Sequence, residues 1–374
     1  MNGDGLLAAA ELRSAAMAEW LADLVACESP SNDAVALARC ADLLAGYGAE
    51  AFGYPPERVV VDGRTHLLWR PGATATVLLL GHYDTVWPLG TLADWPYTVD
   101  GDRATGPGTF DMKAGIVQML AAVALARVPD RVALLLTADE EIASGTSRAL
   151  IEEQAGTVGA VLVGEPSADG GRLKTARKGG ATYRLRVTGR AAHAGLEPER
   201  GVNATVELAH QVTGLAALAD PAWGTTVTPT VLSGGTTTNT VPESAQVAVD
   251  VRAWTATEQD RVDAALRGLA PVLPGARLEV SGGVHRRPLE ETASGALHAL
   301  AERAADDVGL ELPPPARSGG ASDGNLTAAL GIPTLDGLGA VGEYPHGRGE
   351  YVLLSALAPR AALLARLLQL LAAR

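Results

Sequence analysis

The sequence predicts an α/β protein in which a mostly parallel-sheet domain is interrupted by an inserted ferredoxin-like α+β domain. Short, mostly apolar segments such as 77–80 and 131–136 alternate with helical segments, a pattern typical of buried parallel strands. Near Lys178 this pattern changes to strands whose apolar and polar residues alternate, and the first pattern returns from Ser294. With 374 residues, of which 47% are hydrophobic, the chain is long enough to bury two cores.

The first domain is expected to comprise residues 1–179 and 289–374. Apolar residues between positions 12 and 27 recur at helical spacing. Asp33 is expected to cap a second helix, which Gly46 and Gly48 would close. The elements expected after it are strands near 58–62, 66–70 and 77–80, a helix after 113, a strand at 131–136, a helix at 147–154, a strand at 158–163, a helix at 294–308 and a last apolar helix through Leu371.

Residues 180–288 are expected to form the inserted domain. Tyr183, Leu185 and Val187 alternate with arginines, which is the period of a strand that is exposed on one face. The elements expected next are a helix near 202–212, strands near 226–232 and 245–252, a helix near 258–269 and a strand at 277–281. This βαββαβ order is that of the ferredoxin-like split unit.

Composition and charge exclude several classes of protein. The formal net charge is −13, whereas phosphate binding requires clustered Lys and Arg, so we expect no nucleic-acid partner. The two cysteines, Cys27 and Cys40, form neither a CxxC metal motif nor a disulfide framework. The N-terminus lacks the regions of a signal peptide, and no uniformly apolar run of about 18 residues predicts a membrane span. We therefore expect a cytoplasmic protein that does not contact a membrane.

The segment Gly81-His82-Tyr83-Asp84 places a histidine and an aspartate two positions apart at the end of a buried strand. In an extended backbone the two side chains point to the same face. A carboxylate that accepts the free ring N–H of a metal-bound imidazole fixes its tautomer and its orientation. Taken alone, the pair fits an ordinary polar strand end equally well.

Further acidic and imidazole side chains lie in comparable loops. Each has a simpler interpretation: Asp111 fits a helix N-cap, Glu165 ordinary loop chemistry and His346 a solvent-exposed histidine. Asp139-Glu140-Glu141 is harder to explain without cations, because three carboxylates at the end of a buried strand repel one another and lose hydration. Two imidazoles and three carboxylates suit Zn²⁺, with Co²⁺ or Mn²⁺ as substitutes, and two such ions about 3.5–4 Å apart can share a carboxylate. The resulting candidate ligands are His82, Asp111, Glu141, Glu165 and His346.

Together these motifs resemble the M20 family of metallopeptidases, and most closely its glutamate carboxypeptidase and N-acyl-amino-acid deacylase branch. The resemblance extends over nearly the whole chain, and its motifs occur in the same order as in the family. The segments that carry it are Gly81–Val86, Gly106–Gly115, Asp139–Glu141, Gly164–Pro166 and Gly189–Gly195, followed by His346.

The resemblance implies a role for each matching residue at a site with two zinc ions per subunit. His82 and Glu165 would hold one ion, Glu141 and His346 the other, and Asp111 would bridge them. Asp84 would orient His82. Glu140 would act as the general base for the bridging water. The peptide bond between Asp111 and Met112 would be cis.

The inserted domain would then be a lid that also forms the interface of a homodimer. His193 resembles the lid histidine that reaches the partner's active site and stabilises the oxyanion. Asn239 and Arg252 match positions that grip the substrate carboxylate. Arg287 is a candidate for a second anionic group, although a solvated surface arginine is the simpler interpretation. Gly320 belongs to a glycine-rich loop that is expected to line the substrate pocket.

The expected function is hydrolysis of an amide bond next to a free carboxylate in a small peptide or N-acyl amino acid, releasing a C-terminal amino acid as a glutamate carboxypeptidase does. The alternative is an N-acyl-amino-acid deacylase of amino-acid or secondary metabolism, and Glu165, where the family's aminopeptidases usually have Asp, favours either one. A serine hydrolase is a remote alternative, because Gly320–Gly324 fits G-x-S-x-G around Ser322 but no strand is expected before it. A metal-binding protein without turnover is disfavoured, since Glu140 is present.

Overall fold

The computed structural model describes residues 3–72 and 74–373, which form two compact units. The first unit takes Met1–Ala176, Glu291–Ser318 and Ser322–Arg374, and the second takes Arg177–Glu290 with Gly319–Ala321. The boundaries expected from the sequence, 180 and 288, lie within a few residues of these.

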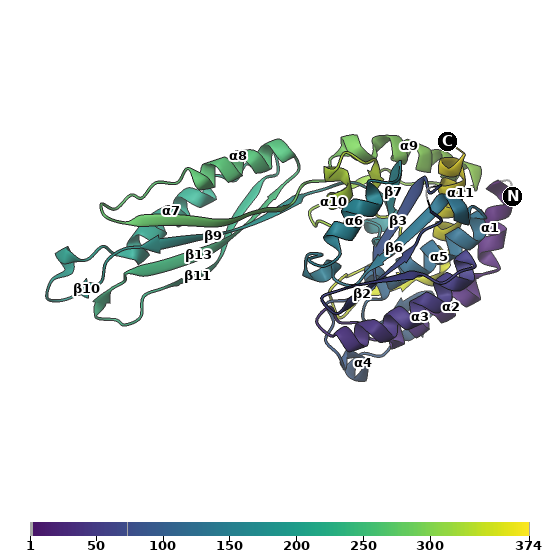
Figure 1. Ribbon diagram of the computed structural model, residues 1–374, viewed down its shortest axis with the longest axis horizontal. Coiled ribbons are helices and arrows are strands. Elements are labelled where there is room, and N and C mark those ends of the chain that lie inside the picture. Colours follow the sequence, from purple (N-terminus) through teal and green to yellow (C-terminus); the bar gives the residue numbers. More distant parts are fainter. Residues whose placement is uncertain (1–2, 73, 374) are drawn as a thin grey trace. The chain divides into compact units, whose positions relative to one another are not determined.

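The first unit is built on a six-stranded sheet with the order β1-β2-β6-β3-β7-β16 (Figure 1). The strands β6, β3, β7 and β16 pair in parallel, whereas β2 pairs antiparallel with β1 and β6. The mostly parallel sheet predicted from the sequence is therefore confirmed. Its strands are β1 Glu57–Val61, β2 Arg64–Trp69, β3 Val77–His82, β6 Val132–Thr137, β7 Ala160–Val163 and β16 Thr334–Leu335.

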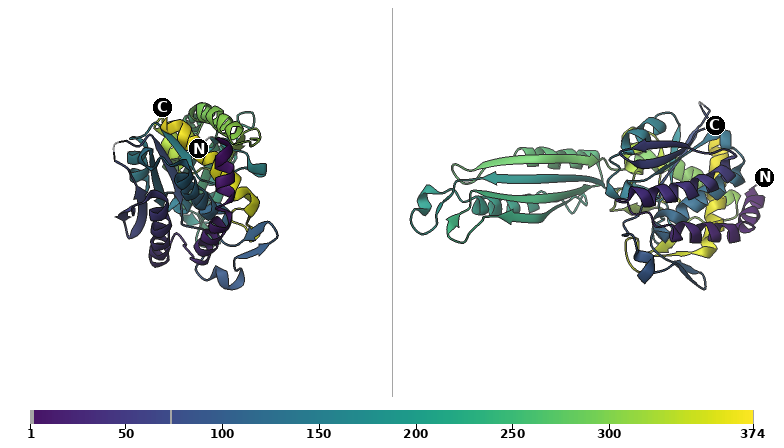
Figure 2. Two further views of the ribbon diagram at one scale, coloured as in Figure 1. Left: turned by 90° about the vertical axis from the view of Figure 1, so that its right-hand side faces the viewer. Right: turned by 60° about the horizontal axis from the view of Figure 1, so that its bottom comes forward.

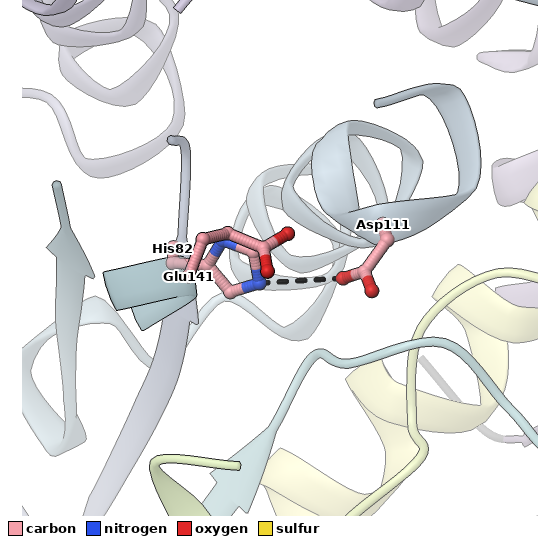
Figure 3. A group of neighbouring side chains, drawn as sticks. All are labelled: His82, Asp111 and Glu141. Atoms are coloured by element: carbon pink, nitrogen blue, oxygen red, sulfur yellow. Dashed lines mark ion pairs between the residues drawn. The ribbon is translucent and has the colours of Figure 1, made fainter. Parts of the chain in front are cut away.

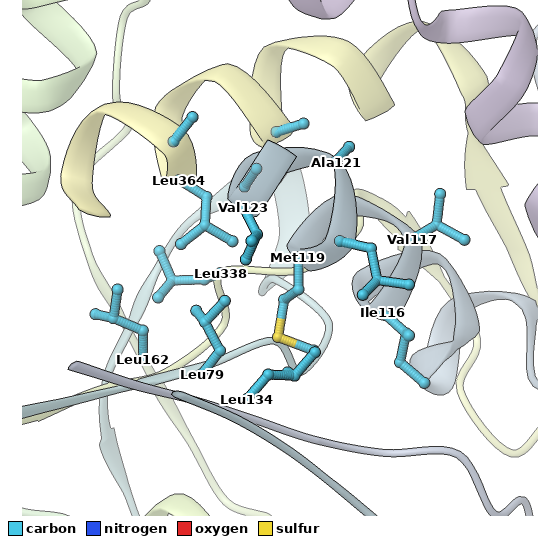
Figure 4. Close-up of a cluster of buried hydrophobic side chains, with 14 of the residues drawn as sticks. Leu79, Ile116, Val117, Met119, Ala121, Val123, Leu134, Leu162, Leu338 and Leu364 are labelled. Carbon is cyan, nitrogen blue, oxygen red and sulfur yellow. The ribbon is translucent and has the colours of Figure 1, made fainter. Parts of the chain in front are cut away.

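Helix α5 (Ala114–Ala126) packs between this sheet and helix α11 (Leu357–Ala372), as Figure 4 shows. By length and composition alone, the segments 109–126 and 354–372 could cross a membrane, but 89% and 61% of them are buried within the protein, as expected of core helices. The other helices of this unit are α1 Gly3–Glu11, α2 Ser14–Ala26, α3 Ala34–Phe52, α4 Thr91–Asp94, α6 Arg148–Ala155, α9 Glu291–Asp307 and α10 Gly324–Ala329.

Helix α3 extends further than the sequence predicted. Asp33 caps it as expected, because its carboxylate accepts two backbone hydrogen bonds from the first turn. The prediction that Gly46 and Gly48 close the helix is wrong, since the helix continues to Phe52 and is capped by Gly53, whose φ of 82° is left-handed. A Cβ atom at Gly48 would lie 2.0 Å from the ring of Trp69. This glycine therefore permits close packing of the helix against β2.

Several short strands of the first unit were not predicted. The strands β17 (Gly342–Glu343), β18 (Tyr351–Leu353), β5 (Arg103–Thr105) and β4 (Thr98–Asp100) form a second sheet in that order. β18 pairs antiparallel with β5, which brings the C-terminal loop before β18 beside the segment that follows β5. In addition, β15 (Ala316–Ser318) pairs with β8 (Lys174–Arg177).

The second unit contains a four-stranded antiparallel sheet with the order β11-β13-β9-β14. The right-hand view of Figure 2 shows this unit in teal and green, with its strands side by side. Together with two helices the sheet gives the βαββαβ arrangement that the sequence predicted. Apolar side chains on one face of β9 and β13 pack against both helices, whereas Arg184 and Arg186 on the other face are exposed. The elements are β9 Gly179–Thr188, β10 Ala192–His193, α7 Ala204–Ala216, β11 Thr226–Gly234, β12 Thr240–Val241, β13 Ser244–Ala253, α8 Ala256–Arg267 and β14 Arg277–Arg286.

Candidate metal centre

Three adjacent parallel strands deliver acidic and imidazole side chains to one edge of the sheet. His82 is the last residue of β3, Glu141 lies in the 3-10 turn after β6, and Glu165 follows β7 by two residues. The carboxyl ends of parallel strands meet at one edge, where ligands bind in open α/β sheets. Asp111, in the irregular turn before α5, and His346, in the loop before β18, complete the group.

The five candidate ligands form two groups that share Asp111. His82 Nε2 lies 3.3 Å from Asp111 Oδ1 and 3.4 Å from Glu165 Oε1. His346 Nε2 lies 3.4 Å from Asp111 Oδ2 and 3.2 Å from Glu141 Oε1. Figure 3 shows the side chains of His82, Asp111 and Glu141 converging, with the pair between His82 and Asp111 dashed. Each oxygen of Asp111 therefore faces a different imidazole.

These separations fit ligand atoms that share a cation. Atoms about 2.0–2.1 Å from a tetrahedral zinc ion are roughly 3.3–3.4 Å apart. Asp111 Oδ1 is buried, and no donor among the described residues satisfies it with hydrogen-bond geometry. A buried carboxylate oxygen without a donor is costly unless a cation compensates it. The donor set therefore fits a dinuclear metal site bridged by Asp111.

The electrostatics of the cluster lead to the same conclusion. Hydrogen bonds with Asp111 and then Glu141 raise the pKa of His346 to about 10. Burial alone would lower the pKa of His82, but the neighbouring carboxylates raise it well above its usual range. Burial also raises the pKa of Glu141. The site thus holds an excess of negative charge, which the imidazoles compensate by binding protons when no cation does.

Asp84 fixes several parts of the site at once. It is fully buried, and its carboxylate accepts hydrogen bonds from Ser31 Oγ at 2.7 Å, Glu140 N at 3.1 Å and Glu141 N at 3.2 Å. The Nδ1 atom of His82 lies 3.0 Å from the Asp84 carbonyl oxygen and 3.4 Å from its carboxylate. The backbone carbonyl, rather than the side chain expected from the sequence, is thus the nearer partner of the imidazole.

The three consecutive carboxylates after β6 have different surroundings. Asp139 is buried, and its Oδ2 accepts hydrogen bonds from Thr146 N at 2.6 Å and Thr146 Oγ1 at 2.7 Å, so it stabilises the loop. Glu140 and Glu141 both face the metal centre. A carboxylate oxygen of Glu140 and donor atoms of His82 and Glu165 lie within 4.8 Å of one another. Glu140 is therefore within reach of a water molecule at this position.

Sequence reasoning missed Glu350, which holds the turn that carries Asp111. Its side chain is fully buried; Oε1 accepts hydrogen bonds from Phe110 N at 2.8 Å and Asp111 N at 3.0 Å. Oε2 accepts them from Gly108 N at 3.1 Å and Trp87 Nε1 at 3.0 Å. Burial raises the pKa of Glu350 to about 7, and these donors oppose that rise. The only signal in the sequence is an acidic residue four positions after His346.

The segment before α5 adopts the backbone that the resemblance implied. The peptide bond between Asp111 and Met112 is cis, and Asp111 has a φ of −113° and a ψ of 97°, which are not helical. Asp111 is nevertheless not the helix N-cap that the simpler interpretation suggested, because α5 begins three residues later, at Ala114, and its N-cap position is Lys113.

The remaining candidate residues belong to the second unit. His193 is exposed, and its Nδ1 accepts hydrogen bonds from Gly195 N and Leu196 N, both at 3.1 Å. His193 pairs with Thr240 between β10 and β12, and the Asn239 carbonyl oxygen accepts a hydrogen bond from Ala194 N. The structure therefore brings His193 and Asn239 side by side.

The two arginines proposed for substrate anions both have acidic partners. Arg252 donates through Nε and Nη2 to Asp250 at 2.9–3.2 Å. Arg287 Nη1 lies 2.6 Å from Asp260 Oδ1 in an exposed ion pair, which fits the simpler surface interpretation. The carbonyl oxygen of Gly320 accepts a hydrogen bond from Arg177 Nη1 at 3.2 Å, which holds this glycine in position.

The geometry does not support the serine-hydrolase alternative. Ser322 is fully buried, and its Oγ donates directly to Asp336 Oδ2 at 2.6 Å. The histidine expected between such a serine and aspartate, His346, instead has its Nε2 at the carboxylates of Asp111 and Glu141. The strand β15 does precede the motif, contrary to expectation, but Ser322 is a structural residue.

The chain is similar in sequence to several known proteins. Over 306 residues the chain is 34% identical to carboxypeptidase G2 of Pseudomonas sp. (strain RS-16), covering 78% of this chain and 73% of that protein. It is also 31% identical over 299 residues to succinyl-diaminopimelate desuccinylase 2 of Shewanella loihica, covering 69% of this chain and 77% of the relative. The acetylornithine deacetylase of Proteus mirabilis is 31% identical over 248 residues, 61% of this chain and 62% of its own length.

Solved structures share the fold. The aminopeptidase PepT of Bacillus cereus superposes with a TM-score of 0.74 at 21% identity, covering 96% of this chain and 99% of that one. The metallo-carboxypeptidase Sso-CP2 of Sulfolobus solfataricus superposes with a TM-score of 0.69 at 18% identity and the same coverage. The family model for peptidases M20/M25/M40 matches residues 78–370, which include all five candidate ligands. This chain therefore belongs to the M20/M25/M40 peptidase family and is a metal-dependent hydrolase.

Proposed function

We propose that the protein is a two-zinc hydrolase that cleaves an amide bond next to a free carboxylate and releases a C-terminal amino acid, as a glutamate carboxypeptidase does. The observation that carries the proposal is the pair of imidazoles, each 3.3–3.4 Å from a different oxygen of Asp111. Bound metal ions would supply Lewis-acid polarisation of the amide and a water of lowered pKa. We propose zinc because imidazole and carboxylate ligands suit it, with Co²⁺ or Mn²⁺ as substitutes.

Glu140 is the proposed general base. Its carboxylate lies beside His82 and Glu165, and its backbone N–H is held by Asp84. From this position it takes a proton from the attacking water and delivers it to the leaving nitrogen. Asp84 keeps the turn of Glu140 and the imidazole of His82 in a fixed relation, since it contacts both.

The second unit is proposed to be a lid and the interface of a homodimer. Two backbone N–H groups donate to His193 Nδ1, so the neutral ring carries its proton on Nε2. A donor of this kind suits an oxyanion, and we propose that it acts at the partner's site. Asn239, beside it, and Arg252 are proposed to bind the substrate carboxylate, for which Arg252 would exchange part of its contact with Asp250.

A deacylase is the second candidate function. Two of the relatives are named as a desuccinylase and a deacetylase, which remove acyl groups from amino acids. Both candidates use the same metal centre and leave a free amino acid, so they differ only in the acyl side of the substrate. We further propose a cytoplasmic location, which the free thiols of Cys27 and Cys40 favour.

The test is a panel of N-acyl and peptidyl amino acids assayed with added Zn²⁺, Co²⁺ or Mn²⁺. We expect release of a C-terminal amino acid, loss of activity with a chelator, and recovery on adding metal. Glu140→Gln should lower kcat by at least about 10²-fold while the metal content stays unchanged. Hydrolysis of a neutral amide analogue at the same rate would contradict the role of the free carboxylate.

The dimer proposal has its own test. Chains carrying His193→Ala and chains carrying Glu140→Ala, inactive separately, should regain activity when they are co-expressed and form mixed dimers. Co-expressed chains that stay inactive would mean that His193 does not act at the partner's site.

A further inference from the structure

A cavity of about 450 Å³ lies beside the metal centre in the first unit. The loop after β3, the loop before α3 and the turn after β6 line it, and one lining residue is the candidate ligand Glu141. Its volume falls within the range of about 300–1,000 Å³ that is typical of small-molecule sites. A substrate whose amide carbonyl is at the metal centre can therefore extend into this cavity.

The cavity has an apolar wall. Val86, Leu89 and Ile142 all line it. These residues are apolar, yet their exposed fractions are 41%, 53% and 41%, respectively. Single exposed apolar side chains are ordinary, but three on one cavity beside a reactive centre are typical of a ligand surface. Pro30 and Pro88 add to the same lining.

The charged groups of the cavity disfavour an anion. Its acidic lining residues are Asp33, which caps α3, and Glu141 at the metal centre; no Lys or Arg is among the described residues that line it. Arg64 contacts the wall, but its Nε and Nη2 donate to the Ser31 carbonyl oxygen at 3.3 and 3.2 Å. A carboxylate placed here would face the negative charge of Asp33 and would meet no cationic side chain among the lining residues.

We propose that this cavity receives the acyl group of the substrate, and that this group is apolar, either a medium-length acyl chain or an aromatic acyl group. The inference rests on the proposed function, because it assigns the side of the scissile amide that lies opposite the free carboxylate. The carboxylate end requires a cation, so only the acyl end matches the cavity. The proposal separates this protein from hydrolases of succinylated substrates.

The test uses the zinc-loaded full chain and N-acyl derivatives of whichever amino acid the panel above shows to be released. The acyl groups are acetyl, butyryl, hexanoyl, benzoyl and succinyl. Each further methylene should raise kcat/KM by about fourfold until the cavity is filled. The succinyl derivative, which has as many carbons as the butyryl one, should be at least tenfold poorer.

Substitutions then locate the effect in the cavity. Leu89→Asp should lower the ratio of kcat/KM for the hexanoyl and acetyl derivatives at least tenfold, because it places a charge on the apolar wall. Leu89 is half exposed, so the fold should tolerate this change. The matched control is Val60→Asp, in strand β1 and 61% exposed, which should leave the ratio unchanged.

The outcomes distinguish this inference from the proposed function. Equal kcat/KM for the acetyl and hexanoyl derivatives, a preference for succinyl over butyryl, or an unchanged ratio in Leu89→Asp would overturn the inference while zinc-dependent release of the amino acid still supported the function. If none of the N-acyl or peptidyl amino acids is cleaved, the proposed function fails and the inference fails with it.

Discussion

Replacing Glu350 with Gln should weaken metal binding although Glu350 is not a candidate ligand. The glutamate carboxylate accepts hydrogen bonds from four N–H donors, three of them on the backbone of the turn that carries Asp111. A glutamine of the same shape has one acceptor oxygen, and its NH₂ group must face either Phe110 N and Asp111 N or Gly108 N and Trp87 Nε1. In either orientation two buried donors lose their acceptor.

The structure gives the size of the effect. A buried donor left without a partner costs about 1–3 kcal/mol, so two of them cost roughly 2–6 kcal/mol. Part of this cost should appear in the free energy of unfolding. Another part should appear as displacement of Asp111, whose two oxygens face different imidazoles. Since about 1.4 kcal/mol corresponds to a tenfold change, we expect the affinity for Zn²⁺ to fall at least tenfold.

The assay compares two measurements on each variant. Competition with a chromophoric chelator gives the Zn²⁺ affinity, and urea unfolding of the metal-free protein gives the stability. Glu343→Gln, at an exposed position in β17 of the same small sheet, is the matched control and should change neither. A Glu350→Gln protein that is less stable but binds Zn²⁺ with wild-type affinity would refute the claim that Glu350 positions Asp111. Wild-type values for both quantities would refute the hydrogen-bond argument itself.

Three further predictions concern other groups. Zn²⁺ binding at pH 8 should release protons, because the pKa of His346 near 10 keeps the imidazole protonated when no metal is bound. Calorimetry in buffers of different ionisation enthalpy measures the number of protons released. For the same reason, the stability of the metal-free protein should fall as the pH rises through about 10. Cys27 should react with iodoacetamide with a midpoint near pH 6, since the hydrogen bond with Cys40 lowers its pKa to about 6, and peptide mass spectrometry should find buried Cys40 unlabelled. Ser322→Ala should retain zinc-dependent turnover but unfold about 1–3 kcal/mol more easily, because Asp336 loses a buried hydrogen bond.

Each of these has a clear contrary result. Proton release that is the same at pH 8 and pH 11 would mean that His346 does not carry the proton. A labelling midpoint near the ordinary thiol pKa of about 8.5 would contradict the stabilised thiolate of Cys27. Loss of turnover in a folded Ser322→Ala protein would return the serine-hydrolase alternative to consideration.

The parts of the fold that the sequence predicted are those set by local patterning. Uniformly apolar segments became β3, β6 and β7, and alternating ones became the antiparallel sheet of the second unit. The end of α3 was missed because glycine often ends a helix, whereas Gly48 lies inside this one. A glycine is needed there because the ring of Trp69 packs directly against it. That contact depends on a strand about twenty residues away, and local patterns do not contain it.

The same distinction between local patterns and long-range contacts explains which residues of the metal centre could be predicted. The candidate ligands could be listed from the sequence, because His82, Glu141 and Glu165 lie at the ends of apolar segments. Asp111 and His346 were added because their motifs resemble those of the family. Glu350 could not, because its role depends on the antiparallel pairing of β18 with β5, which brings two segments about 240 residues apart into contact. Three-residue strands give almost no periodic signal, so this pairing could not be predicted.

Asp84 and Glu350 show how a site with five ligands from five segments can be held in one geometry. Asp84 binds the backbone of the turn that carries Glu140 and Glu141 and contacts His82, while Glu350 binds the backbone of the turn that carries Asp111. Both are buried acceptors that neighbouring N–H groups satisfy, so each fixes the backbone before any cation binds. Since the ligand carboxylates repel one another, such preformed turns reduce the cost of bringing them together. Preorganisation of the metal centre is therefore supplied mainly by buried carboxylates that are not themselves candidate ligands.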